Sequence, residues 1–207
     1  MVGTSAGDRL GIGSVLPLGN GNYVVGSPNW SNGSAVNAGA VTWGNGLGGT
    51  AGPVSAANSL VGTTAEEQLG SSVSLTALTD GSYTVSNPNW DNGGMLDVGA
   101  VTWGNGSGGL VGSSDPSNSL VGSTAGDRVG FVVALPGGRY AVSSGGWDYG
   151  AGVNAGAVTL GKAGGSTTGP LTEFNSVLVT YNVAQLTSNS WDPGRERLAV
   201  GRGFAVS

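Results

Sequence analysis

The sequence predicts an all-β repeat protein with essentially no helix, and three observations support this prediction. The motif "NSLVG" at 58–62 returns at 118–122, and "NSVLV" follows at 175–179. Short runs rich in Val, Tyr, Trp and Thr alternate with Gly, Asn, Asp and Pro clusters, which is the spacing of strands. No segment carries apolar residues at helical spacing between caps.

The repeats divide the chain into three complete units and a divergent C-terminal segment that looks like part of a fourth. Their expected bounds are 2–60, 61–120, 121–179 and 180–207. Each complete unit holds four short apolar runs. In the second unit the expected strands are 72–79, 82–88, 99–104 and 117–122.

The first two strands of each unit are joined by a tight turn. The turns are "NG" at 20–21, "DG" at 80–81 and "GG" at 137–138, residues that accept the positive φ of a type I′ hairpin. Four antiparallel strands in about sixty residues form the blade of a β-propeller. The prediction is therefore a propeller-like array of about three and a half blades, fewer than the four to eight of a closed ring. A threefold β-prism is the alternative that three units permit.

Composition excludes several classes of function. Net charge is −5 with no basic cluster, so no nucleic-acid partner is expected. No apolar stretch reaches about eighteen residues, so no membrane insertion is expected. Cysteine and histidine are absent, which removes the usual zinc ligands and the commonest general base; we expect no enzyme, no metal and no cofactor. The first residues lack a leader pattern, so any export signal is expected outside this chain.

Three motifs of the first unit resemble the FG-GAP blade of integrin-like propellers: "RLG" at 9–11, "GSP" at 26–28 and "GAVTWG" at 39–44. The whole unit also resembles the tandem repeats of large bacterial surface proteins of the filamentous-haemagglutinin and adhesin type. These resemblances imply an extracellular or cell-surface location. FG-GAP blades commonly bind calcium through an Asp-rich loop, but the three equivalent turns here hold one carboxylate, Asp80. Calcium takes six to eight oxygen ligands, so the metal site is not carried over.

Two tryptophans are expected to pack between neighbouring blades. Trp43 and Trp103 alternate with Val41 and Val101 on one face of the third strand, and the third unit has Leu160 at the equivalent place. A position that accepts Leu is filled for its volume, so core packing is the interpretation.

A second group of tryptophans closes the second strand of each unit, and each is followed by a polar loop. One interpretation is that the indole stacks on a sugar while neighbouring Asp and Asn bind its hydroxyls. The other is that the indole plugs the gap between blades and the polar residue makes an Asx-turn. Trp191 fits no register. The candidate ligand residues are Trp30, Asn32, Trp90, Asp91, Asn92, Trp147 and Asp148.

Two other motifs are interpreted as turns. "AGDR" at 6–9 and 125–128, with "AEEQ" between them, predicts a solvated turn, and the adjacent Glu66 and Glu67 would point apart rather than form a glycosidase pair. "GNGLGG" and "GNGSGG" lack the Lys-Ser/Thr ending of a phosphate loop and are expected to be flexible turns.

The function expected from these features is non-enzymatic: an extracellular module for adhesion or weak carbohydrate binding through its Trp-Asp/Asn loops. The alternative is a purely structural spacer or assembly unit of a giant bacterial surface protein. Glycans or a host or neighbouring cell surface are the candidate partners. Self-association is also expected, because the first unit would leave the face with Val41 and Trp43 uncovered. At the other end, strands 198–200 and 204–206 would cover the third unit.

Overall fold

The computed structural model describes the chain except for residues 73, 151, 179–185, 193–196 and 203–207. Its strands form three sheets, each with four antiparallel strands in sequence order, and a C-terminal hairpin; a fifth, parallel strand joins the second sheet. The first sheet contains β1 (Ser14–Pro17), β2 (Tyr23–Ser27), β3 (Ala40–Gly44) and β4 (Ser59–Val61). The second contains β5 (Leu75–Ala77), β6 (Tyr83–Asn87), β7 (Ala100–Gly104) and β8 (Ser119–Val121). The third contains β9 (Phe131–Ala134), β10 (Tyr140–Ser144), β11 (Ala157–Gly161) and β13 (Ser176–Leu178).

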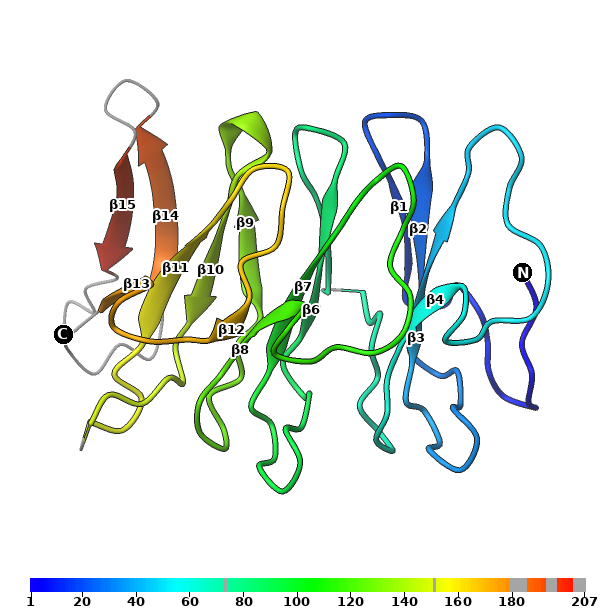
Figure 1. Cartoon of the computed structure of the whole chain (residues 1–207), viewed down its shortest axis with the longest axis horizontal. Helices are drawn as coiled ribbons and strands as arrows, with labels where there is room; N and C mark the ends of the chain where they lie inside the picture. The colour runs from blue at the N-terminus through cyan, green and yellow to red at the C-terminus, as the bar shows by residue number, and fades with distance from the viewer. Residues whose placement is uncertain (73, 151, 179–185, 193–196, 203–207) are drawn as a thin grey trace, which may run out of the picture.

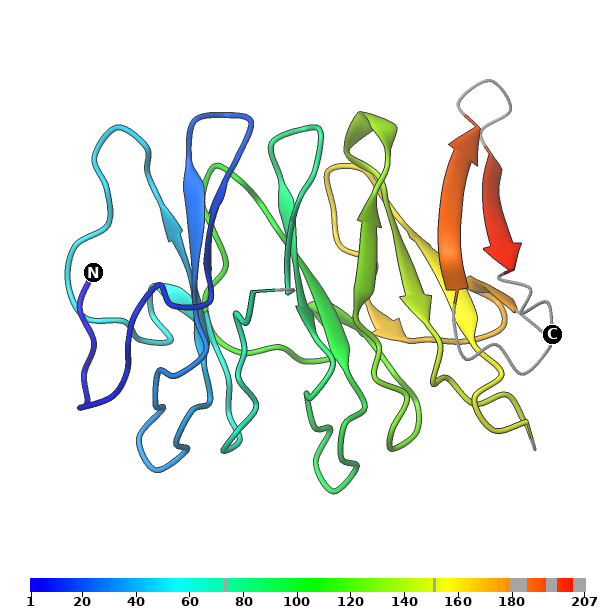
Figure 2. The ribbon, with the colours of Figure 1, turned by 180° about the vertical axis from the view of Figure 1, so that it is seen from behind.

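The expected all-β repeat is therefore confirmed. The single helical element of the described residues is one 3₁₀ turn, Pro136–Gly138. A short strand of the third unit, β12 (Gly169–Pro170), reaches back and pairs with β8 in parallel. The sheets follow one another in a row, with the N-terminus and first sheet at one end and the C-terminal hairpin at the other (Figures 1 and 2). The described strands form an open row and close no ring.

The C-terminal hairpin consists of β14 (Leu186–Asp192) and β15 (Arg197–Arg202), which are antiparallel. The strand expected at 198–200 thus lies within β15, and its partner is β14. Trp191, which fitted no register in the sequence, belongs to β14 opposite Leu198. The other expected strand, 204–206, lies outside the described residues.

The hairpin turns differ from the expected type I′. In the first unit the Leu18 amide donates to the Asn22 oxygen at 2.8 Å, and three residues lie between them. Only Gly21 of this turn has a positive φ, 85°. A type I′ turn needs two such residues, so this is a three-residue loop with a left-handed glycine and a G1 bulge. The second unit repeats it at Gly81, and the third has two left-handed glycines, Gly137 and Gly138.

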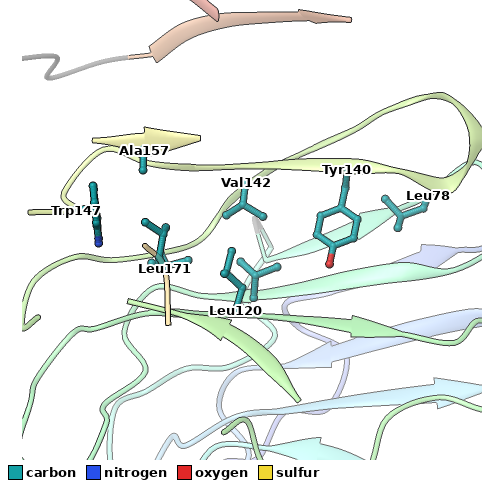
Figure 3. Packing of buried hydrophobic residues seen from close by; sticks show 9 residues of the cluster. Leu78, Leu120, Tyr140, Val142, Trp147, Ala157 and Leu171 are labelled. Atoms are coloured by element: carbon teal, nitrogen blue, oxygen red, sulfur yellow. The ribbon is translucent and has the colours of Figure 1, made fainter. Parts of the chain in front are cut away.

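The hydrophobic core lies between consecutive sheets. Val41 and Leu60 of the first sheet pack with Tyr83 and Val85 of the second. The second sheet packs on the third in the same way, and Figure 3 shows Leu78 and Leu120 beside residues of the third unit. Burying one such side chain contributes about 1.5–3 kcal/mol, so face-to-face packing holds the row together. The third-unit residues drawn in Figure 3 with labels are Tyr140, Val142, Trp147, Ala157 and Leu171.

The packing expected for Trp43 and Trp103 is confirmed. Each is partly buried and lies against the core that its sheet shares with the following unit. The Trp43 indole N–H also donates to the Gly106 oxygen of the second unit at 2.8 Å. The expectation that the face with Val41 and Trp43 is uncovered in the first unit is wrong, because that face points toward the second unit. Val41 is 1% exposed.

The repeated "NS" of "NSLVG" has a structural explanation. Ser59 shares a 2.7 Å hydrogen bond with Thr42 across β3 and β4. Its neighbour Asn58 accepts from the Ser55 amide at 3.0 Å and donates to the Pro53 oxygen at 2.9 Å, which closes the loop before β4. The second and third units repeat these bonds at Asn118 and Asn175.

A tyrosine begins the second strand of each unit and lies opposite a glycine that ends the third strand. The three pairs are Tyr23–Gly44, Tyr83–Gly104 and Tyr140–Gly161. A Cβ atom at any of these glycines would overlap the tyrosine ring. The ring therefore takes the place of the missing side chain. Burial raises the pKa of Tyr83 and of Tyr140 above the usual tyrosine value.

We expect the protein to lose stability above about pH 10, the ordinary tyrosine pKa. Because the folded state raises the pKa of Tyr83, it binds the phenolic proton more tightly than the unfolded state does. Its contribution is complete below the unfolded pKa and is lost as pH rises toward the folded pKa. Melting temperatures measured between pH 8 and 11.5 should fall less steeply for Tyr83→Phe than for wild type. A Tyr83→Phe protein whose melting temperature falls as steeply as that of wild type would contradict this role of the Tyr83 proton.

Candidate functional site

The tryptophan loops, defined as residues 30–39, 90–99 and 147–156, begin at the three tryptophans proposed as ligand residues. The structure buries all three indoles. Trp30, Trp90 and Trp147 are 4%, 5% and 4% exposed. Trp90 packs on Val98 and Val121 of its own unit. Indoles this deeply buried present no face for stacking on a sugar, and this favours the packing interpretation.

The polar candidate residues form hydrogen bonds within their own loop or with the loop that follows it in the sequence. The Asp91 carboxylate accepts from the Asp97 amide at 2.8 Å, and Asp148 accepts from the Asn154 amide at 2.7 Å. These bonds span six residues, so they brace the whole loop and are not the expected Asx-turns. The remaining candidates contribute loop contacts: Asn32 donates its side-chain amide to Gly62, and Asn92 exchanges two backbone bonds with Met95.

The "AGDR" and "AEEQ" motifs lie in what we term the entry loops, residues 3–10, 62–69 and 122–129. The expectation of a solvated turn is wrong for the acidic residue at its third position. Asp8, Glu67 and Asp127 are 3%, 4% and 1% exposed. Their carboxylates are buried because they accept hydrogen bonds from the loop that they close.

Each buried carboxylate organises its entry loop in the same way. Asp127 accepts from the amides of Ser123 and Thr124 at 2.6 and 2.9 Å. Glu67 accepts from the amides of Thr63 and Thr64 at 2.7 and 3.0 Å, and from the Asn87 side chain at 2.6 Å. Each of these carboxylates accepts several hydrogen bonds from its own loop, so its role is to stabilise the loop conformation.

Replacing Asp127 with alanine should lower the free energy of unfolding by about 1–3 kcal/mol, because two backbone donors lose their partner. Urea unfolding followed by tryptophan fluorescence measures the change. Glu173 is exposed and serves as the matched acidic control: Glu173→Ala should stay within about 0.5 kcal/mol of wild type. Equal stability of the two variants would contradict the role assigned to Asp127.

The entry loops join consecutive units. Four consecutive carbonyl oxygens of the first tryptophan loop, residues 36–39, accept from amides of the second entry loop at 2.9–3.1 Å. The second and third units repeat this joint with residues 96–99 at 3.0–3.2 Å. Leu69 and Val129, at the end of each docked entry loop, are 1% and 0% exposed. We term this arrangement of four backbone bonds and one buried side chain the seam.

The seam includes a charged pair at its surface. Arg128 of the third entry loop lies 2.7 Å from the Asp97 carboxylate of the second tryptophan loop. At the first seam Asn37, the counterpart of Asp97, instead donates its side-chain amide to Glu66 at 3.0 Å. Arg9, Gln68 and Arg128 occupy the same position in the three entry loops, and all have positive φ.

A small polar pocket of about 200 Å³ lies at the hairpin-turn end of the second unit. Its lining includes Asp80, Trp103 and Asn105 of that unit and Asn20 of the first. The Trp103 indole N–H donates to the Ser82 hydroxyl at 3.1 Å, and Ser82 in turn donates to Asp80. The sequence had assigned Trp103 to packing and Asp80 to a turn, and only the structure brings them together.

One comparison with known proteins identifies the repeat. A family described as a repeat of unknown function (DUF5650) matches residues 17–71, 77–131 and 134–188. The chain belongs to the DUF5650 repeat family. The first two DUF5650 copies each contain a tryptophan loop and the entry loop that docks on it. One copy thus contains both halves of a seam.

No curated protein matches the chain. Within the described residues, no three metal-ligating side chains gather at one place. The same part of the chain has no helix long and apolar enough to cross a bilayer.

Proposed function

We propose that this DUF5650 array is a non-enzymatic scaffold, a spacer and assembly unit of a large bacterial surface protein. The observation that carries the proposal is the seam. The side chains that recur in every unit, including the tryptophans and the buried carboxylates, are used to build units and join them. Such repetition produces a rigid row whose length depends on the number of units.

The proposed cell-surface location is supported by the resemblance of the repeats to those of adhesin-type surface proteins. In a longer array the row of sheets would curve into a propeller ring or continue as a stack. The low charge and the many Asn, Ser, Thr and Gly residues fit an exported surface protein.

Weak carbohydrate binding is the second candidate. The polar pocket at Asp80 is a better candidate site for it than the tryptophan loops, whose indoles are buried. A half-buried indole, a carboxylate and side-chain amides are the groups that orient a sugar. The pocket occurs where Asp80 and Ser82 replace the Asn20 and Asn22 of the first unit.

A glycan array distinguishes the two candidates. The scaffold proposal expects no glycan signal from the wild-type chain and a cooperative thermal melt. If binding does occur, Asp80→Ala should abolish it while Asp115→Ala, at an exposed carboxylate outside the pocket, should retain it. A signal with that pattern would replace the scaffold proposal with a lectin-like one.

A further inference from the structure

The first entry loop, residues 3–10, has the shape of its docked counterparts although no tryptophan loop of the described chain covers it. Asp8 accepts from the amides of Thr4 and Ser5 at 2.6 and 2.8 Å, and from Ser31 at 3.1 Å. Arg9 has a φ of 40°, and the equivalent Gln68 and Arg128 have 53° and 49°. The loop is therefore already folded into the docking conformation.

The backbone amides that would hold a tryptophan loop have no acceptor at this first entry loop within the described residues. In the second unit the amides of Gly62, Glu66, Gln68 and Leu69 each donate to the first tryptophan loop. The equivalent amides, those of Gly3, Gly7, Arg9 and Leu10, have no partner within the described part of the chain. A cavity of about 430 Å³ lies beside them.

We propose that this entry loop is a docking site for the third tryptophan loop of a second copy of the chain. Residues 153–156 of that loop read "VNAG", as do residues 36–39, which fill the seam between the first two units. The backbone is matched too, since Asn37 and Asn154 have φ of 53° and 54°. The docked loop would accept four backbone hydrogen bonds from the open amides.

The third tryptophan loop is less covered than the first two at the equivalent positions. Ala38 and Val98, at the centre of the two occupied seams, are both 0% exposed. The equivalent Ala155 is partly exposed and Asn154 is exposed. Figure 1 shows this loop, drawn in yellow, at the far end of the row from the N-terminus. Contact between opposite ends is head-to-tail, so copies would add in an open chain.

This inference rests on the proposed scaffold role, but the two can fail separately. Loss of association would leave the cooperative melt of a single chain unchanged, whereas a glycan-binding result would leave association unchanged. Sedimentation velocity over a wide concentration range is the primary measurement. The average mass should rise with concentration, and a strict monomer up to millimolar concentration would overturn the proposal.

A glycine in the third tryptophan loop gives the decisive variant. In the occupied seams a Cβ at Gly39 or Gly99 would overlap the backbone of the docked entry loop. Around the equivalent Gly156 the nearest described atom lies 3.7 Å from such a Cβ. Gly156→Ala should therefore weaken association about tenfold or more without repacking its own unit.

Gly150→Ala is the matched control, because Gly150 lies in the same loop. Its φ is 58°, that of Gly156 is 76°, and a Cβ there meets no described atom within 4 Å. Both variants carry the same kind of backbone strain, so both should melt alike as single chains. Equal association of the two variants would overturn the assigned surface.

A substitution that recreates the Arg128–Asp97 ion pair between two copies should strengthen their association. Arg9 of one copy would face Asn154 of the other, as Arg128 faces Asp97. Asn154→Asp should tighten association about two- to fivefold at low salt, and adding Arg9→Gln should remove that gain. A gain that survives Arg9→Gln would show that the loop docks elsewhere.

Discussion

Replacing Trp90 with alanine should lower the free energy of unfolding by about 3–5 kcal/mol, the largest effect expected of a single substitution here. The indole is 5% exposed and packs on Val98, Ala100 and Val121 at the base of its loop. Removing it leaves a cavity that this short loop, braced by Asp91, cannot fill by moving. Urea unfolding monitored by far-UV circular dichroism measures the loss.

Leu96→Ala is the control for this prediction, since Leu96 belongs to the same loop and is 64% exposed. It should change stability by no more than about 0.5 kcal/mol. A Trp90→Ala protein as stable as wild type would show that the indole is not a packing element. If Trp90→Ala lost a glycan signal at unchanged stability, the indole would be a ligand-binding group.

Gly99→Ala should cost about 3 kcal/mol. Gly99 has a φ of 78°, and a Cβ there would overlap the Val129 backbone of the third unit. The substitution thus adds an overlap, typically about 1–3 kcal/mol, to the strain of a left-handed residue, about 1–2 kcal/mol. Because the overlap lies in the seam, the second and third units should lose contact with each other. Amide hydrogen exchange should accelerate at Arg128 and Val129 before it does within β6.

Gly93→Ala separates the two costs. Gly93 has a φ of 61°, lies in the same loop, and a Cβ there meets nothing within 4 Å. Only the backbone strain remains, so the loss should be about 1 kcal/mol. If both variants lost the same stability, the close approach at Gly99 would not matter.

The strands were predictable because each carries a local signal. The run expected at 82–88 is β6 at Tyr83–Asn87, and that expected at 99–104 is β7 at Ala100–Gly104. Comparing units also predicted the packing of Trp43 and Trp103, since the third unit has Leu160 at the same position. The hairpin type was not predictable in this way, because "NG" and "DG" also suit a three-residue loop with one left-handed residue.

The seam was not predictable because it consists mainly of backbone bonds between units. A carbonyl oxygen leaves no trace in side-chain patterns, and the main sequence trace of the close approach is the glycine at 39 and 99. The buried carboxylates did leave a signal: Asp8, Glu67 and Asp127 keep an acid at one position while the next residue varies between Arg and Gln. That variation suggested a solvated turn, although it is the buried carboxylate that accepts the hydrogen bonds of the loop.

Because the described sheets pack on neighbouring sheets in the row, the cooperativity of unfolding is expected to be that of a one-dimensional lattice. An inner unit gains two seams and an end unit gains one, so denaturation should begin by fraying from an end. Each DUF5650 repeat added to the array should raise the midpoint of unfolding by a smaller step than the one before. Chain length, more than any one side chain, would then determine how strongly such an array resists unfolding.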